Sequence, residues 1–437
     1  MTGEEFADAL VSRGIASTER SSKARLFDIA MSPLREGNIA TSIWVPGRLE
    51  LFGRHTDYAG GRSILAAVPR GFVFVSAPRT DGEIVVVDAA TGQSIRPAAG
   101  GASAGWPQYA RVVVRRLARN FPGASGGVTI SFASDLPQAA GMSSSSALVV
   151  GIAMSLITAW RLEGRVEWHE AIDEPSALAT YLACIENGSD YGPLSGDAGV
   201  GTRGGSEDHV AMLLCRPHQF SAFSFMPVRH IQDAPLPREW TLVVASSGVP
   251  AEKTADAKQV YNQLADATQV LLRLWNEREA VAPSLAAALK SDPDAPVRLK
   301  ALVLSNRIDG WPAEVLLRRI DHLVLENRCV DDAMDAIDTM NAEALNAVSM
   351  KSQQAAEALL RQQVPETMAL AHEAHQAGAF GACSFGAGFG GSVWAIVASD
   401  DAADFGSEWA ERYHRRFPER DGVMFVACPG PPVVEFA

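Results

Sequence analysis

Cysteine is scarce in this chain and shows no pairing pattern. The five cysteines stand far apart, and no two of them are separated by only two residues. Disulfide-rich scaffolds carry an even set of cysteines at regular spacings, and cysteine zinc sites need close pairs. The sequence argues against both, and we expect a reduced, cytoplasmic protein.

Positive charge is also in short supply. Lys and Arg number 38 against 51 Asp and Glu, which gives a net charge of −13. A nucleic-acid partner is therefore not expected, because binding a phosphate backbone requires a basic face. Any anionic ligand would need a local site of backbone N–H groups and a metal ion, since the overall charge does not attract it.

Long hydrophobic runs are missing as well. The chain begins MTGEEFADAL, with acids where a signal peptide carries positive charge. The longest apolar-rich run, residues 147–160, is interrupted by Ser155 and Thr158 and is too short to cross a bilayer. We expect no signal peptide and no membrane partner, and we interpret this run as a buried helix.

What the chain does contain is a change from strand-like to helix-like patterns along its 437 residues, which suffice for two or three domains. Strands are predicted for residues 49–53, 64–68, 71–76, 83–88, 128–133, 240–246 and 392–397. Helices are predicted for residues 106–120, after residue 146 and, divided by prolines, over 255–370. Residues 181–205, rich in Gly, Ser and Asp, are predicted to be largely loop. The pattern predicts an α+β chain of two domains, residues 1–229 and 230–437.

The first segment that carries chemistry is residues 46–61, PGRLELFGRHTDYAGG. It looks like a strand that ends in a glycine turn and presents Arg48, Arg54, His55 and Asp57 together. A carboxylate, an imidazole and a guanidinium on one loop can orient sugar hydroxyls and stabilise transferred charge. The alternative is a polar hairpin whose charges pair with one another.

The second segment is residues 136–148, LPQAAGMSSSSAL, between a predicted strand and an apolar helix. Small residues let the backbone approach an anion, and the N–H groups at a helix start carry partial positive charge. No lysine follows the glycine, so this is not the GxxxxGK[ST] loop. A flexible serine linker is the alternative, and the flanking strand and helix disfavour it.

A third segment, residues 385–393, reads FGAGFGGSV. Alone it indicates only a tight turn before a strand. The three segments in this order resemble the signature motifs of the GHMP kinases, a family named for galacto-, homoserine, mevalonate and phosphomevalonate kinases. The first is most similar to the galactokinase signature: PGR, then GRHTDY, then two glycines; residues 106–109, WPQY, also resemble galactokinases.

This resemblance implies a two-domain α+β fold with the active site in the cleft between the domains. It implies ATP- and Mg²⁺-dependent phosphorylation of a monosaccharide, with galactose at its C1 hydroxyl as the first choice. A small-molecule sugar and ATP would then be the partners of a monomer or weak homodimer. Alternatives are another acceptor, such as arabinose, a uronic acid or a heptose phosphate, or a non-catalytic sugar sensor.

Motif positions imply residue roles for nucleotide and metal. The ATP phosphates would be held by Gly141, Ser143, Ser144, Ser145, Gly388 and Gly390. The magnesium ligands would be Ser145 and Glu186. The alternative for Glu186 is a surface glutamate that ends a helix.

The same resemblance assigns the reacting centre and the sugar contacts. Asp208, in the Gly-rich stretch of residues 204–209, would act as base, with Arg48 keeping it ionised; the alternative is that Asp208 caps the next helix. His55, Asp57 and Gly205 would orient the sugar.

The chain departs from galactokinases at three of these places, with Glu50 for Asn, Arg54 for Glu and His209 for Gln. The family's glutamate binds the hydroxymethyl end of galactose, and arginine cannot accept a hydrogen bond. We therefore expect Arg54 at the substrate, where it would suit the carboxylate of a uronic acid. The alternative is that Arg54 pairs with Glu50 or Glu207 and galactose still binds.

A further departure concerns the family's sugar-contacting tyrosine, whose place is taken by Lys258. Tyr261 follows three residues later, and positions three apart share a helix face. Tyr261 could therefore contact the sugar instead; the alternative is that it packs against the domain.

Overall fold

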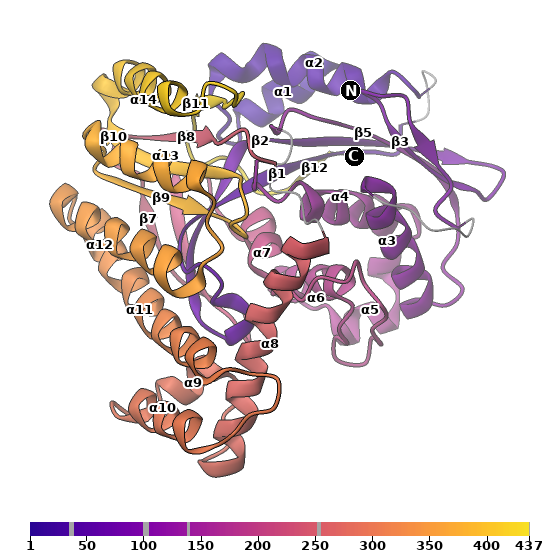
Figure 1. The fold of residues 1–437 in the computed structure, drawn as a ribbon. Helices are drawn as coiled ribbons and strands as arrows, with labels where there is room; N and C mark the ends of the chain where they lie inside the picture. The colour runs from indigo at the N-terminus through magenta and orange to yellow at the C-terminus, as the bar shows by residue number, and fades with distance from the viewer. Residues whose placement is uncertain (35–38, 99–104, 138–139, 251–254, 437) are drawn as a thin grey trace.

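The computed structural model describes residues 1–34, 39–98, 105–137, 140–250 and 255–436, with residues 255–257 described by their backbone only. Gln138 and Ala139 of the serine-rich segment lie outside the described residues. The described chain forms two β-sheets covered by helices, with a smaller helical lobe at one end (Figure 1). This mixed architecture confirms the predicted α+β class.

The larger sheet has eight strands in the order β12-β1-β2-β5-β3-β4, and β6 joins β2 and carries β7. Its long central pair, β1 and β2, is antiparallel, and the register shifts twice, between Pro46 and Arg48 with the extra residues in β2 and between Glu50 and Phe52 with the extra residue in β1. The strands are β1 (Thr41–Phe52), β2 (Arg62–Arg79), β3 (Ile84–Asp88), β4 (Ser94–Ile95), β5 (Gly127–Ser134), β6 (Gln219–Ser224), β7 (Arg229–Pro235) and β12 (Val434–Phe436).

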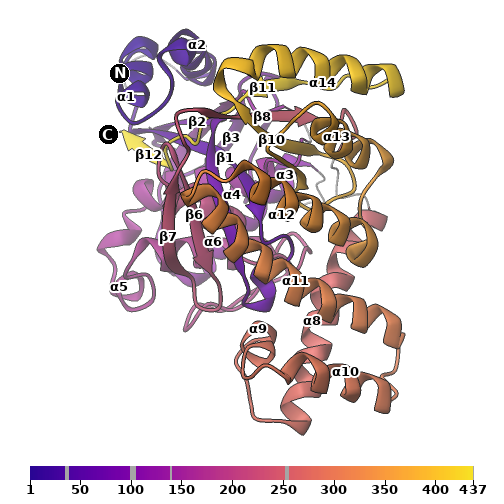
Figure 2. The same cartoon turned by 90° about the vertical axis from the view of Figure 1, so that its left-hand side faces the viewer.

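Helices cover both faces of this sheet (Figures 1 and 2). Alternate residues of β2 explain why: Phe72 and Phe74 face one buried cluster, whereas Val73 and Val75 face another. The second cluster is closed by α1 (Gly3–Val11) and α2 (Arg20–Met31). The first is closed by α3 (Trp106–Asn120), α4 (Ser144–Ala159) and α6 (Pro175–Asn187), with α5 (Val166–Ala171) and α7 (Glu207–Leu214) nearby.

The smaller sheet has four strands, in the order β11 (Met424–Val426), β8 (Trp240–Ser246), β10 (Ser392–Ala398) and β9 (Gly381–Phe385). It too is buried on both faces, which explains the almost continuous apolar sequence of β8 and β10. One face packs on α13 (Pro365–Gln376) and α14 (Ala402–Arg416), and the other faces the main core with α11 (Ala313–Asp338) and α12 (Ala342–Ala355).

The helical lobe projects beyond the two sheets (Figure 2). It consists of α8 (Ala255–Arg278), α9 (Leu285–Leu289) and α10 (Ala295–Ser305), packed on the start of α11. Leu271, Leu299 and Ile320 are fully buried in its separate core. This lobe therefore has hydrophobic support of its own while α8 extends towards the main body.

Most predicted elements are confirmed, with two corrections. The predicted helix at residues 106–120 and strand at residues 240–246 coincide with α3 and β8. Residues 64–68 and 71–76 belong to one continuous strand, β2, and the predicted loop at 181–205 is wrong for its first part, which completes α6. The division into domains at residue 229 stays a prediction; the change of sheet follows β7, after Pro235, and β12 returns to the larger sheet.

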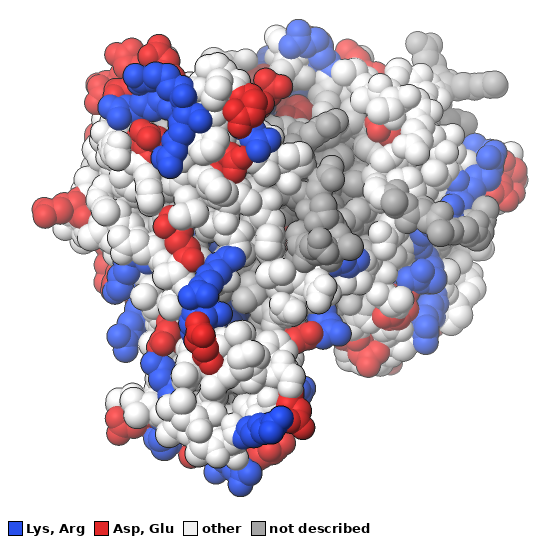
Figure 3. All heavy atoms as spheres, viewed as in Figure 1, with Lys and Arg blue, Asp and Glu red and all other residues white. Residues whose placement is uncertain are grey.

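Side chains of both charge signs are interspersed on the face seen in Figure 3, including the helical lobe. Among the described helices, none is both long and apolar enough to cross a membrane. All five cysteines, each in a described part of the chain, are free.

Candidate active site

A cavity of about 700 Å³ lies where the two sheets meet. Its lining comes from the end of β1 and the turn after it, the start of α4, the end of α6, the start of α7, and α8. Gly386 and Ala387, which follow β9, close it from the side of the smaller sheet. The segments singled out in the sequence thus converge on one cleft.

Arg48 is the central cation of this cavity. It lies between the two register shifts in the pairing of β1 with β2, and such irregularities redirect side chains near the end of a strand. Its Nε donates to Oδ1 of Asp208 at 2.6 Å, and its Nη1 donates to the carbonyl of Gly141 at 2.9 Å. Burial opposes the charge on Arg48, yet the carboxylates around it, Asp208 foremost, raise its pKa overall. Arg48 therefore stays charged and holds two segments of the cavity together.

Asp208 lies in the first turn of α7 and faces the cavity. Ser206, not Asp208, occupies the N-cap position of this helix. The Asp208 carboxylate interacts through Oδ1 with Arg48 and through Oδ2 with the hydroxyl of Ser146, 3.1 Å away. The helix-cap alternative is therefore wrong, and the carboxylate is held where a general base could act.

The serine-rich segment enters α4 by a sharp turn. Ser143 is the N-cap residue in the left-handed region, at φ 58°, and makes no capping hydrogen bond with its side chain among the described residues. The first N–H groups of α4 are thus available to an anion, and Ser143, Ser144 and Ser145 line the cavity beside them. This arrangement fits the phosphate groups of a nucleotide.

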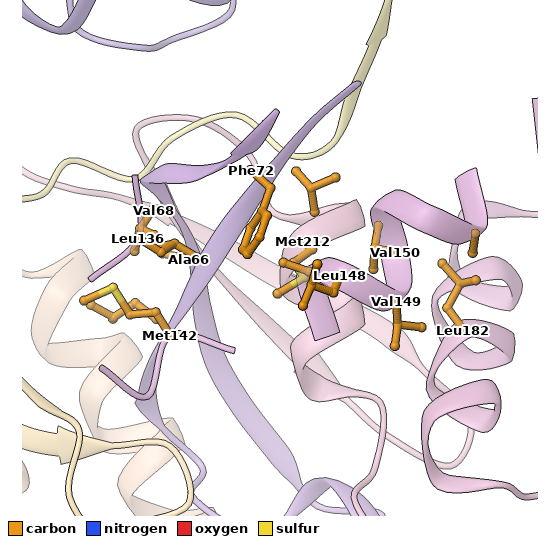
Figure 4. Packing of buried hydrophobic residues seen from close by; sticks show 14 of the residues in the cluster. Ala66, Val68, Phe72, Leu136, Met142, Leu148, Val149, Val150, Leu182 and Met212 are labelled. Atoms are coloured by element: carbon orange, nitrogen blue, oxygen red, sulfur yellow. The ribbon is translucent and has the colours of Figure 1, made fainter. Parts of the chain in front are cut away.

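A hydrophobic anchor holds this turn against the sheet (Figure 4). Met142 and Leu136 are buried in the main core and lie together with Val68 of β2. Gly47 lets them approach, because a Cβ there would lie 2.7 Å from Leu136. The Arg48 N–H also donates to the Met142 carbonyl at 3.2 Å. The turn is therefore rigidly attached to the strand that carries Arg48.

Glu186 lies in the last turn of α6 and is 6% exposed, so the alternative of a surface glutamate is wrong. Its Oε2 accepts a hydrogen bond from Ser146 at 2.8 Å, and His209 Nε2 lies 3.4 Å from the same atom. Ser145 also lines the cavity, but the hydrogen bond to Glu186 comes from Ser146. The serine beside Glu186 is therefore Ser146.

The side chains of the protein alone do not form a complete magnesium site. Across the residues that the structure describes, no group of three or more His, Cys, Asp or Glu side chains could hold a metal ion. Glu186 and neighbouring serine hydroxyls supply the oxygen ligands that Mg²⁺ prefers, and phosphate oxygens would complete such a site.

The opposite wall of the cavity carries the predicted sugar contacts. Nδ1 of His55 lies 2.9 Å from the Tyr58 hydroxyl, and the ring of Tyr261 is 5.4 Å from that of His55. Burial, reinforced by Arg319, lowers the pKa of His55 to about 3, so its imidazole is neutral at pH 7. Tyr261 lies at the cavity, as required if it substitutes for the family's tyrosine.

Asp57 and Gly205 meet on this wall at close range. Oδ2 of Asp57 accepts a hydrogen bond from the N–H of Glu207 at 3.2 Å. A Cβ on Gly205 would lie only 2.2 Å from the same oxygen. Glycine is therefore required here, and Asp57 is positioned by the start of α7.

Two buried glutamates lie behind Arg48. Burial raises the pKa of Glu207 well above its ordinary value, with Glu50 adding to the effect, and burial also raises the pKa of Glu50. The two carboxyl groups interact with each other, so a charge on one disfavours a charge on the other. Ser63 donates to Glu207 at 2.9 Å and the Gly386 N–H to Glu50 at 3.3 Å. The pair thus forms a buried acidic layer under the reacting groups, and burial favours the neutral form of both carboxyl groups.

Comparison with known families agrees with this geometry. The galactokinase galactose-binding signature matches residues 40–78, the GHMP kinases N terminal domain matches 108–191, and the GHMP kinases C terminal domain matches 333–415. The chain belongs to the GHMP kinases. The first match covers the loop with His55 and Asp57, and the second covers the serine-rich turn and Glu186.

Two proteins with similar sequences are named galactokinases. A galactokinase of Roseiflexus sp. (strain RS-1) is 26% identical over 382 residues, covering 84% of this chain and 86% of that protein. A galactokinase of Mycobacterium tuberculosis (strain H37Rv) is 29% identical over 377 residues, covering 84% and 91%.

Solved structures show the same fold. The Lactococcus lactis galactokinase complexed with galactose superposes with a TM-score of 0.77 at 21% identity, covering 95% of this chain and 99% of that one. A mevalonate kinase of Methanococcus jannaschii has a TM-score of 0.55 at 14% identity, covering 90% and 99%.

The expected substrate contact of Arg54 must be corrected for this GHMP kinase. Arg54 is 2% exposed, and its guanidinium donates to the Ser384 carbonyl and, at 2.9 Å, to Cys383 Sγ on β9. The side chain thus points into the contact between the two sheets and not into the cavity. Nε and Nη1 of Arg54 are buried without a hydrogen-bond partner among the described residues, so the guanidinium makes no hydrogen-bonded ion pair with Glu50 or Glu207, the alternative considered from the sequence.

Gly388 and Gly390 must be corrected as well. Cβ atoms there would lie 2.2 Å from Gln362 and 2.6 Å from the Val249 carbonyl, and both glycines have left-handed backbones. They shape the turn after β9, but Gly386 and Ala387 are the residues of that turn that line the cavity. The turn reaches the site through its first residues, not through its central glycines.

Sequence reasoning missed several lining residues of this GHMP kinase. They are Glu50, Tyr109, Ser146, His209 and Lys258. Each of them stands beside a motif residue or at a departure from the family pattern. This position is the sequence feature that could have predicted them as lining residues. Their contacts depend on pairing between segments distant in sequence, which no local pattern reveals.

Proposed function

We propose that this GHMP kinase transfers the γ-phosphoryl group of ATP to the C1 hydroxyl of galactose. The observation that carries the proposal is the double contact of Arg48, with Asp208 at 2.6 Å and with Gly141 at 2.9 Å. One side chain thus links a carboxylate that can face an acceptor hydroxyl to the turn that can hold phosphate. Phosphoryl transfer depends mainly on such positioning and on electrostatic stabilisation.

Galactose is supported by the sugar wall of the site. His55, Asp57 and Tyr58 lie within the stretch that matches the galactose-binding signature, and the relatives of similar length are named galactokinases. The uronic-acid alternative loses its basis, because the Arg54 guanidinium that motivated it is bonded to β9.

The proposed reaction assigns one role to each group of the chain. Asp208 accepts the proton of the C1 hydroxyl as that oxygen forms a bond to the γ-phosphorus and the bond to the ADP oxygen breaks. Arg48 keeps Asp208 ionised, and the start of α4 binds the phosphates. Glu186 and the adjacent serines would hold Mg²⁺, which neutralises charge on the phosphates when bound.

Two further properties remain proposals. We infer that the protein works in the cytoplasm, which the free cysteines support. We also infer a monomer or weak homodimer, which light scattering coupled to size-exclusion chromatography measures directly.

The test of the proposed function is ADP release over a panel of sugars with ATP and Mg²⁺. The panel contains galactose, glucose, arabinose, galacturonate and a heptose phosphate, and ³¹P NMR identifies the phosphorylated carbon. We expect preferential turnover of galactose and a product phosphorylated at C1. Turnover of another acceptor without galactose, or ATP and galactose binding without any turnover, would overturn the proposal.

A further inference from the structure

The fourth serine of the serine-rich segment lies between two acidic side chains of the site. Ser146 is in the first turn of α4 and is 1% exposed. Its Oγ lies 2.8 Å from Oε2 of Glu186 and 3.1 Å from Oδ2 of Asp208. The resemblance gives this residue no role, and the proposed reaction counts it only among the serines beside Glu186.

A serine hydroxyl carries a single proton. Ser146 can therefore donate to Glu186 or to Asp208, but not to both at once. The two carboxylate oxygens can be no farther apart than the sum of their distances to Oγ, so they are close enough to repel each other when both are ionised. A buried hydroxyl between them reduces that repulsion and fixes their spacing.

Each of the two carboxylates also has a neighbour other than Ser146. Asp208 is held on Oδ1 by Arg48, and Glu186 has His209 Nε2 3.4 Å from the same oxygen that Ser146 contacts. Arg48 thus lies beside Asp208 and His209 beside Glu186, and the hydroxyl of Ser146 contacts both carboxylates.

We propose that Ser146 is a positioning residue that sets the separation of the metal-ligand candidate Glu186 and the base candidate Asp208. This inference rests on the proposed function. If Glu186 directed its oxygen to a metal ion, the Ser146 hydroxyl would donate its hydrogen bond to Asp208 instead. The nucleotide side and the sugar side of the site would then be coupled through one hydroxyl. Loss of this hydroxyl weakens metal binding and slows the chemical step, while the sugar wall stays intact.

Ser155 provides a matched control. It lies on the same helix, is fully buried, and donates to the Gly151 carbonyl at 2.8 Å, away from the cavity. Ser155→Ala removes a buried hydroxyl from α4 without touching Glu186 or Asp208. Ser146→Thr is the second comparison, because it keeps a hydroxyl at the site.

The experiment measures Mn²⁺ binding in the presence of ADP by electron paramagnetic resonance, together with kcat and the galactose KM, in the full chain. For Ser146→Ala we expect Mn²⁺ affinity and kcat to fall about 10- to 100-fold, as for other groups that orient metal ligands. The galactose KM should change little, and Ser146→Thr should recover most of both losses. Ser155→Ala should match the wild type in binding and turnover.

Three results would overturn the role of Ser146. These are wild-type Mn²⁺ affinity in Ser146→Ala, equal losses in Ser146→Ala and Ser155→Ala, or a Ser146→Thr variant as impaired as Ser146→Ala. A wild-type protein that binds Mn²⁺·ADP but does not phosphorylate galactose would overturn the proposed function alone. The comparison of Mn²⁺ affinities would still decide the role of Ser146 in that case.

Discussion

Arg48 and Asp208, 160 residues apart in the chain, form a 2.6 Å ion pair at the centre of the cavity. The arginine lies where the pairing of β1 with β2 shifts register on both sides of it, and the aspartate lies where α7 begins beside the sugar wall. The same guanidinium holds the Gly141 carbonyl. The position of the base candidate is therefore tied to that of the phosphate-binding turn.

Replacing Asp208 tests the assigned base. In Asp208→Ala we expect kcat to fall about 10²- to 10⁴-fold, because the proton of the acceptor hydroxyl loses its acceptor. ATP binding should persist, since the start of α4 is unchanged. ADP release and calorimetric titration with ATP measure the two effects, and wild-type turnover in this variant would contradict the mechanism.

Arg48→Lys tests whether the two contacts of the guanidinium matter beyond its charge. An ammonium group cannot reproduce the fork that reaches both Asp208 and Gly141. Losing one hydrogen bond to a charged group costs about 1.5–3 kcal/mol, so kcat/KM should fall by about tenfold or more. Arg412→Lys is the control, because Arg412 pairs with Glu408 on the surface of α14. Equal activities of the two variants would show that charge alone is sufficient.

The sequence predicted the elements better than the directions of individual side chains. Contiguous patterns located α3, β8 and the turn before α4, because periodicity and small residues act locally. The direction of Arg54 could not be predicted this way. It follows from a bulge in β1 and from partners on β9 that are 329 and 330 residues away.

The same limit applies to charge and hydroxyl groups within the site. Glu50 stood out only as a departure from the family pattern, and its pKa is raised, like that of Glu207, because folding buries both carboxyl groups. Ser146 was one serine in a run of four, and its contacts with two other helices distinguish it from its neighbours.

Gly205→Ala should impair the sugar site. The new Cβ would lie 2.2 Å from Asp57 Oδ2, so the carboxylate or the start of α7 must move. Because displacement of about 1 Å costs up to about 10²-fold in rate, we expect kcat/KM for galactose to fall by about tenfold or more. The control is Gly406→Ala on α14, where a Cβ meets nothing within 4 Å; it should leave kinetics unchanged and stabilise the helix by about 0.5–1 kcal/mol. Unaltered galactose kinetics in Gly205→Ala would contradict the assigned contact.

Arg54→Met tests the corrected position of Arg54. We expect a loss of stability of about 1–3 kcal/mol, because the bonds to Cys383 and Ser384 are removed. The ratio of kcat/KM for galactose to that for galacturonate should not change, since the guanidinium does not line the cavity. Urea unfolding and parallel kinetics give the two numbers, and a shifted ratio would place Arg54 at the sugar after all.

His55 should make folding stability depend on pH. Its pKa is lowered by burial from 6.5 to about 3, so between these values the unfolded chain binds a proton that the folded chain does not. The stability contributed by neutral His55 is complete above pH 6.5 and is lost as the pH falls towards 3, at about 1.4 kcal/mol per pH unit. Glu50 and Glu207, whose pKa values are raised, act in the opposite direction, so the variant His55→Gln serves to isolate the histidine.

Between pH 7 and pH 5 the wild type should lose about 2 kcal/mol more unfolding free energy than His55→Gln, measured by urea denaturation. Parallel pH profiles for the two proteins would mean that His55 titrates normally and is not buried in the folded state.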